Sequence, residues 1–188
     1  MRDVLKRLAA VSMIAATAAC ANNDFSTVSP TAPGADALSG YQLSEIAVTF
    51  APDAQLSWCE DNLWQCDMVE LRIAQTFEAG TRAGAAELLN GGKPARLEVR
   101  VTEFDSLSLL ARMTTGGVHY IGADYRLADA ATGRELAKAE RLDFDRIAWG
   151  RTAGLIANLT GRTQRVRIAE RIADVTRQWL TALRGAGV

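Results

Sequence analysis

The stretch VHYIGADYRLADAATGRELA, residues 118–137, alternates apolar and polar residues up to Asp129 and then turns. One phase of the alternation holds the residues expected to face the core: His119, Ile121, Ala123, Tyr125 and Leu127. A period of two is typical of a strand with one buried face. Residues 129–133 have the length of a hairpin loop, with a glycine where left-handed backbone is usually needed. We therefore expect strands over 118–129 and from Arg134 to about Ile147, paired antiparallel.

Two earlier segments also have the pattern of strands. Residues 96–102 (RLEVRVT) alternate strictly, and Phe104 breaks the phase, which indicates a bulge near Glu103. Residues 41–50 (YQLSEIAVTF) are rich in β-forming residues, and Ala51-Pro52-Asp53 is expected to end that strand. The next residues, 55–66, show no period and are interpreted as a loop.

Two segments have helical periodicity. Between Asp67, a candidate N-cap, and Asn90-Gly91-Gly92, apolar and small residues recur at spacings of three and four. Gly80 and Gly84 lower the helix propensity of this segment, so we expect them to permit close approach to a sheet. A second helix is expected after Thr163, and its apolar stripe consists of Ile168, Ile172, Val175, Trp179 and Leu183.

The order strand, helix, strand, strand, strand, helix predicts an α+β fold. Both helices must bury an apolar stripe, and three consecutive strands are most easily joined as an antiparallel meander. We expect a two-layer sandwich, β-α-β-β-β-α, with two helices on one face of a four-stranded, mainly antiparallel sheet. A right-handed crossover through the first helix would join the first two strands if they are parallel.

The first nineteen residues have the three parts of a bacterial signal peptide. A basic start (MRDVLKR) precedes an apolar run over 8–19, which is too short for a hydrocarbon core that needs about 20 residues. Thr17-Ala18-Ala19-Cys20 resembles a lipobox, in which cleavage precedes a cysteine that is then acylated. Thr17 stands where a bulky apolar residue is usual, so secretion as a soluble periplasmic protein, cut at one of the alanines, remains the alternative. In lipoproteins of this class, Ala21 rather than Asp after the cysteine points to the outer membrane.

The remaining chain divides into a tether and one domain. Residues 20–40 are polar, contain two prolines and two glycines, and are expected to be a flexible tether from a palmitate-bearing Cys20. Residues 41–188 suffice for one α/β domain. Residues 20–188 hold 18 basic and 21 acidic residues, a net charge near −3, which argues against a nucleic-acid partner.

Three cysteines in an exported chain leave one without a partner. With Cys20 lipidated, Cys59 and Cys66 form the expected disulfide bond around a short loop. That loop holds Leu63 and Trp64 and is flanked by Trp58, which suggests an aromatic anchor for an envelope protein partner. The alternative, which the sequence favours, is that the tryptophans tuck under the loop as a small core.

The sequence lacks the usual catalytic constellations. Its single histidine, His119, is expected to be a core or edge residue with a local hydrogen bond rather than a ligand or base. Glycine-rich nucleotide motifs are absent, so no cofactor and no metal site is predicted. Asp143 and Asp145 have ordinary surface spacing, and nothing in the sequence supports them as a glycosidase pair.

Arginines along the last helix suggest two alternatives. The helix either binds an anionic lipid surface or, as we favour, exposes these arginines to solvent. The favoured reading includes self-pairing, as between Asp174 and Arg177 and between Arg167 and Glu170.

The element order behind a lipidated cysteine and a polar tether resembles that of small Gram-negative outer-membrane lipoproteins. Penicillin-binding-protein activators, curli-secretion-like lipoproteins and the lipopolysaccharide-assembly lipoprotein are examples. The hairpin DAATGRELA, with Asp129, Thr132, Gly133 and Leu136, resembles hairpins of uncharacterised families of this kind. The resemblance implies a non-enzymatic binding or scaffolding role in outer-membrane or cell-wall assembly. A cell-wall hydrolase or transferase that uses carboxylates is the alternative.

Overall fold

The computed structural model describes residues 38–58, 69–107, 117–148 and 163–185. Leu38, three residues before the expected start of the domain, is already part of the core at 1% exposure. The elements are β1 (Tyr41–Ser57), α2 (Val69–Ala85), β2 (Lys93–Asp105), β3 (Gly117–Asp129), β4 (Glu135–Asp143), β5 (Arg146–Ala148) and α5 (Gln164–Gly185). No helix of the described residues is long and apolar enough to span a membrane.

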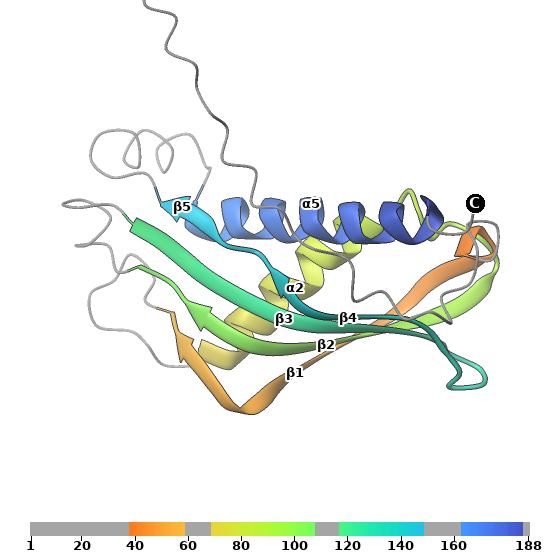
Figure 1. The fold of residues 1–188 in the computed structure, drawn as a ribbon, viewed down its shortest axis with the longest axis horizontal. Coiled ribbons are helices and arrows are strands. Elements are labelled where there is room, and N and C mark those ends of the chain that lie inside the picture. Colours follow the sequence, from red (N-terminus) through yellow and green to blue (C-terminus); the bar gives the residue numbers. More distant parts are fainter. Residues whose placement is uncertain (1–37, 59–68, 108–116, 149–162, 186–188) are drawn as a thin grey trace, which may run out of the picture.

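The sheet has the strand order β1-β2-β3-β4, with β5 paired to the beginning of β3. β1 and β2 are parallel, and the other neighbours are antiparallel. Both helices cover the same face of the sheet, and the other face is open (Figure 1). The predicted α+β sandwich of order β-α-β-β-β-α is therefore confirmed.

The strand alternation has the predicted phase. All five residues of β3 that were expected to face the core are at most 2% exposed, as are Ala95, Leu97, Val99 and Val101 of β2. Beneath the helices, the hydroxyl of Tyr125 lies 2.8 Å from Thr81 Oγ1 and 3.3 Å from Thr176 Oγ1. This buried polar contact ties β3 to both helices.

The last helix also begins and buries its stripe as predicted. Val166 N donates to Thr163 Oγ1 at 3.4 Å, which satisfies one of the unpaired N–H groups at the helix start. The five stripe residues are at most 1% exposed.

The glycines of α2 face a different neighbour from the one expected. A Cβ on Gly80 would lie 2.6 Å from Ala169 O and 2.7 Å from Ile172 Cβ, both in α5. The nearest atoms around Gly84 also belong to α5. The glycines thus permit close helix–helix packing, and the prediction that they approach the sheet was wrong.

Two strand boundaries also differ from the sequence prediction. β1 does not end at Pro52: it continues to Ser57, because residues 51–54 bulge out of the ladder between Phe50 and Gln55. Proline has no N–H for a ladder, and a bulge on an edge strand accommodates it. The strand expected from Arg134 to Ile147 is divided at Phe144 and Asp145 into β4 and β5, and both parts pair with β3.

Candidate functional site

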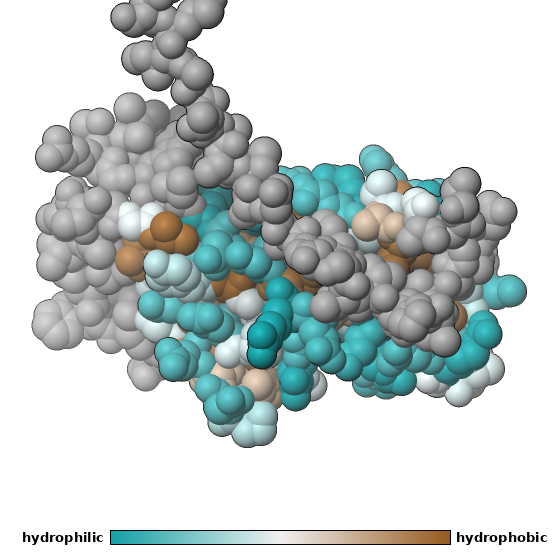
Figure 2. Space-filling view, viewed as in Figure 1, coloured by the Kyte–Doolittle hydropathy of each residue, from teal (hydrophilic) through white to brown (hydrophobic). Residues whose placement is uncertain are grey.

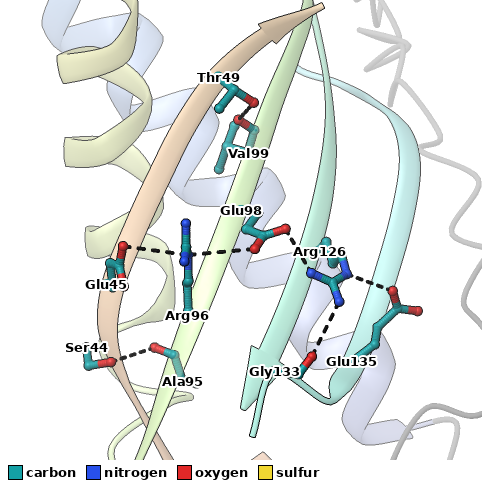
Figure 3. A network of polar contacts seen from close by, with 10 residues as sticks. All are labelled: Ser44, Glu45, Thr49, Ala95, Arg96, Glu98, Val99, Arg126, Gly133 and Glu135. Atoms are coloured by element: carbon teal, nitrogen blue, oxygen red, sulfur yellow. Dashed lines mark hydrogen bonds and ion pairs between the residues drawn. The ribbon is translucent and has the colours of Figure 1, made fainter. Parts of the chain in front are cut away.

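The open face of the sheet carries alternating charges across its strands. Arg96 of β2 lies 3.6 Å from Glu45 and 3.7 Å from Glu98, and Arg126 of β3 lies 2.9 Å from Glu98 and 3.0 Å from Glu135. Figure 3 shows this row running from β1 to β4. All five side chains are more than a third exposed, so the pairs are worth little in stability and make this half of the face polar.

Farther along the same face, bulges in three strands occur at one level. β1 bulges at residues 51–54, β2 bulges at Thr102, and Glu140 and Arg141 of β4 both stand opposite Asp124. Gly122 of β3 lies between them, and a Cβ there would be 3.1 Å from Thr102 Oγ1. Bulges bend strands locally, so three of them around a glycine hollow the face.

This hollow, called here the open-face cleft, has a volume of about 610 Å³. Its charged and aromatic lining residues come from all four long strands and the segment after β4: Asp53, Arg100, Glu103, Tyr120, Asp124, Glu140, Arg141, Asp143 and Asp145. Tyr120 is 50% exposed, one of three large apolar side chains described as exposed. On the face shown in Figure 2, most of the coloured surface is hydrophilic, with smaller apolar patches.

Asp124 organises one wall of the cleft. Its Oδ2 accepts from Arg100 Nη2 at 2.8 Å and Nε at 3.1 Å, and its Oδ1 accepts from the backbone N–H of Arg141 at 3.0 Å. Asp124 raises the pKa of the Arg100 guanidinium, first through the hydrogen bonds and then through its charge. Arg141 has a φ of +55°, and its N–H, displaced by the bulge, finds an acceptor in Asp124.

Asp145, in the segment after β4, also lines the cleft, and the charges of Asp143 and Glu103 act on it. Its Oδ1 accepts from Ile121 N at 2.8 Å, and its own N–H donates to Asp143 Oδ1 at 2.7 Å. Burial raises the pKa of Asp145 to about 6, although the hydrogen bond from Ile121 opposes the shift. The charges of Asp143 and Glu103 and a hydrogen bond between the Asp143 and Asp145 carboxyl groups raise it further.

The described residues contain no group of three or more His, Cys, Asp or Glu side chains that could hold a metal ion. His119 is 2% exposed, faces the core, and accepts from Leu107 N through Nδ1 at 3.1 Å. The predicted local hydrogen bond of this histidine is confirmed. The chemistry open to the cleft is therefore that of carboxylates, arginines and one tyrosine.

Five of the six residues predicted for lipidation, the disulfide bond and partner contact lie outside the described part of the chain: Cys20, Cys59, Leu63, Trp64 and Cys66. Trp58 is described and is 2% exposed, with its ring stacked on Phe104 at 5.1 Å between centroids. The ring of Trp58 is thus part of the core, in agreement with the alternative prediction that the tryptophan is buried rather than available to a partner. The anchor hypothesis consequently depends on Leu63 and Trp64.

The arginines of α5 do not form one solvated face. Arg177 pairs with Asp174 at 3.0 Å, as predicted, and Arg165 donates to Gln75 of α2 at 3.3 Å. Arg167 is only 9% exposed, and its carbonyl accepts from Arg146 of β5. Arg184 donates to the carbonyl of Leu88. The side chains of Arg165 and Arg184 thus join α5 to other parts of the fold, Arg177 pairs within the helix as predicted, and Arg167 is not a solvated residue.

The sequence analysis missed the cleft. Of its lining residues, only Asp143 and Asp145 were weighed as a candidate site, and nothing in the sequence supported that pair. The phase break at Phe104 was the one sign of a bulge. Nothing in the sequence marked positions 124, 140 and 141 as site residues, because hydrophilic residues are common on the exposed face of a strand.

One family model matches nearly all of the described part of the chain. A model described as a family of unknown function (DUF6778) matches residues 41–187. No curated protein matches.

Several solved structures are similar at low identity. A candidate lipoprotein from Caulobacter crescentus CB15 is 18% identical over 80% of this chain and 96% of that chain, with a TM-score of 0.40. The PelC dodecamer from Paraburkholderia phytofirmans is 17% identical over 79% and 91%, with a TM-score of 0.37. Protein XCC0632 from Xanthomonas campestris, of family DUF330, is 10% identical over 82% and 92%, with a TM-score of 0.40. At these values the similarity carries no inference about function.

Proposed function

Because the chain belongs to DUF6778, a family of unknown function, we propose a role from its own residues: a non-enzymatic lipoprotein that binds or scaffolds another envelope component. Its lipid-bearing residue is Cys20, and its contact surface is the open-face cleft. The anchor holds the domain at the periplasmic face of the outer membrane. The observation that carries the binding role is the cleft itself.

The proposed location rests on the first forty residues. The basic start, apolar run and Cys20 have the order of a lipoprotein leader, and the family match begins only at residue 41. Multiple acyl chains at about 0.8 kcal/mol per buried methylene would make the attachment effectively permanent. The polar tether predicted over 20–40 then separates the bilayer from the domain.

The binding role rests on the construction of the cleft. A regular sheet with a polar outer face needs no bulge, whereas here three strands depart from regular pairing around Gly122. The result is a concavity with converging polar groups and a half-exposed ring, Tyr120, on its wall. Polar groups fix the orientation of a ligand, and an aromatic side chain supplies contact area.

A second candidate function, a carboxylate-dependent cell-wall hydrolase or transferase, has one observation in its favour. Asp145 has a raised pKa and lies near Glu103 in a cleft, as a general acid beside a second carboxylate would. Against it, Asp143 already accepts from the backbone N–H of Asp145 at 2.7 Å, whereas the paired carboxyl groups of glycosidases face a substrate across about 5 to 9.5 Å. Asp145 also has a structural duty, because it accepts from Ile121 N. We therefore place this function second.

In-cell crosslinking with matched variants tests the binding role. Tyr120→Ala removes a ring that is 50% exposed in the cleft, and Leu71→Ala removes a side chain that is 49% exposed on α2. We expect Tyr120→Ala to lose crosslinked species that Leu71→Ala and the parent retain. Identical crosslinks in all three proteins would contradict a contact through the cleft. Trp64→Ala in the same experiment tests the alternative anchor on the loop between Cys59 and Cys66.

Two further measurements test the proposed location and the proposed lack of enzymatic activity separately. Palmitate labelling and membrane fractionation should show label and membrane association for the parent and neither for Cys20→Ala. Asp145→Asn should bind as the parent does, whereas the hydrolase candidate requires a parent activity on purified cell wall that this variant lacks.

A further inference from the structure

The open face of the sheet divides into two halves of different charge. In the half drawn in Figure 3, carboxylates and guanidiniums alternate from Glu45 to Glu135, so every charge there has a partner of opposite sign. The open-face cleft breaks this alternation. Six carboxylates but only two guanidiniums, those of Arg100 and Arg141, line it. The cleft is therefore the acidic half of the face.

Ion pairs leave most of this negative charge unbalanced. Asp124 is paired with Arg100, and Glu140 with Lys138. The other four carboxylates of the cleft form no ion pair within the described part of the chain, and they share the cleft with one more guanidinium, that of Arg141. Four carboxylates against one guanidinium leave an excess of three negative charges, which a cationic ligand would complement.

Backbone N–H groups keep two of these four carboxylates in their charged form. Asp145 Oδ1 accepts from Ile121 N at 2.8 Å, and Asp143 Oδ1 accepts from Asp145 N at 2.7 Å. Such donors stabilise the ionised state of a carboxyl group. Even with its pKa raised to about 6, Asp145 is mainly ionised at neutral pH. The negative charge of the cleft is thus present at neutral pH.

The register of the ladders places two of the unpaired carboxylates on either side of a glycine. Gly122 of β3 stands opposite Glu103 of β2 and opposite Asp143 of β4. Neighbouring strands are about 4.8 Å apart, so the Cα atoms of Glu103 and Asp143 are separated by about 10 Å across Gly122. Because Gly122 has no side chain, only backbone lies between the two carboxylates. We call this space, bounded by Glu103, Gly122 and Asp143, the Gly122 slot.

An aromatic ring and a fixed ion pair bound the Gly122 slot along β3. Side chains on one face of a strand recur at every second residue, so Tyr120 and Asp124 are the neighbours of Gly122 on the open face. Tyr120 is 50% exposed, and Asp124 is held by Arg100. The slot thus combines two free carboxylates with an accessible ring. A guanidinium can donate to the first and stack on the second.

We propose that the Gly122 slot binds an arginine side chain of a protein partner, with the guanidinium between the carboxylates of Glu103 and Asp143 and against the ring of Tyr120. This inference rests on the proposed binding role of the cleft and names the chemistry of its partner. Arginine fits better than lysine, because its planar fork of N–H groups meets carboxylates and also stacks on aromatic rings. The cleft volume of about 610 Å³ is within the range of about 300–1,000 Å³ for ligand pockets, so neighbouring residues of the partner also enter.

The test is a titration of the isotope-labelled full chain, purified in detergent, with short peptides and observed by nuclear magnetic resonance. The probe is acetyl-Ala-Ala-Arg-Ala-Ala-amide, and two matched peptides carry lysine or citrulline in place of arginine. We expect the arginine peptide to cause saturable shifts of the backbone amides of Tyr120 and Gly122. Citrulline keeps the shape of arginine but is neutral, so its peptide should bind about tenfold more weakly because all ion pairs are lost. The lysine peptide should fall between the two, since its ammonium keeps the charge without the planar fork.

Two variants with the same change of charge locate the binding on the face. Glu103 lines the Gly122 slot, whereas Glu45 lies on the same face outside the cleft. Glu103→Gln should weaken binding of the arginine peptide about two- to fivefold, as expected for one ion pair at an exposed site. Glu45→Gln should leave the affinity unchanged. Both side chains are exposed, so both variants should fold.

Four results would overturn the arginine site. The first is the absence of saturable shifts with the arginine peptide, and the second is equal affinity for the citrulline peptide; both need only the parent protein. The third is equal weakening by Glu103→Gln and Glu45→Gln, which would place the cation elsewhere on the face. The fourth is equal affinity for acetyl-arginine-amide, which would make the ligand a small cation rather than a protein segment. None of these results changes whether Tyr120→Ala loses crosslinks in cells, so failure of the arginine site and failure of the binding role are distinguishable.

Discussion

Replacing Gly80 with alanine should weaken the contact between α2 and α5. The new Cβ would lie 2.6 Å from Ala169 O and 2.7 Å from Ile172 Cβ, well inside van der Waals contact. The first of these atoms is backbone, so the helices must separate. Overpacking of this kind costs about 1–3 kcal/mol, and the better helix propensity of alanine returns about 1 kcal/mol. We expect a net loss of up to about 2 kcal/mol in the free energy of unfolding.

Chemical denaturation followed by far-ultraviolet circular dichroism measures this loss. For a domain of this size, a loss of about 2 kcal/mol corresponds to a decrease in Tm of about 4–8 °C. Gly185→Ala is the matched control, because Gly185 is also in a helix and a Cβ there meets nothing within 4 Å. We expect that control to be at least as stable as the parent. If Gly80→Ala were as stable as Gly185→Ala, the proposed close packing of the two helices would be refuted.

Three further substitutions test the core, the hairpin and the cleft by the same denaturation assay. Tyr125→Phe should cost about 1–2 kcal/mol, because the buried hydroxyls of Thr81 and Thr176 lose their shared partner. Gly133→Ala should cost about 1 kcal/mol, because Gly133 has a φ of +71° and the space around a Cβ is open, so only backbone strain acts. Asp145→Asn should be more stable than the parent above pH 6, by at most about 1 kcal/mol because the half-buried side chain is screened by solvent.

The sign of the last prediction follows from the raised pKa of Asp145. The folded state holds its proton up to about pH 6, and the unfolded state loses it near pH 3.9. The stability that this group contributes is complete below about pH 3.9 and is lost as the pH rises through 6. Asparagine does not titrate, so the advantage of Asp145→Asn should shrink from pH 7.5 to pH 4.5. An advantage that grew toward low pH would have the wrong sign.

Each of the other two predictions has a contradicting result. Tyr125→Phe with parental stability would mean that the threonine hydroxyls pair with each other or with water. Gly133→Ala with parental stability would mean that the hairpin 129–134 relaxes to another turn at no cost.

The sequence was sufficient for the elements whose pattern is local. The alternation over 118–129 depends on one strand with one buried face, and the stripe from Ile168 to Leu183 depends on one helix, so each pattern could be interpreted alone. Even the glycine at 133 followed from the turn that its hairpin requires.

Features that depend on a partner element could not be predicted in the same way. Gly80 signalled close packing, but only the fold shows that the neighbour is α5. Pro52 predicted an interruption of the first strand. Because β1 is an edge strand, the interruption is a bulge rather than the end of the strand. The cleft requires bulges of three strands to fall at one level, and that alignment is set by the register of the ladders rather than by any one strand.

The N-terminus of the protein isolated from its native membranes is the most direct test of lipid anchoring. Mass spectrometry of the N-terminal peptide should show a chain that begins at Cys20 and carries added mass from acyl groups. Two results would contradict lipid anchoring and remove the basis for a role at the membrane. One is a chain that still begins at Met1, and the other is a chain cleaved after an alanine of the signal peptide with an unmodified Cys20.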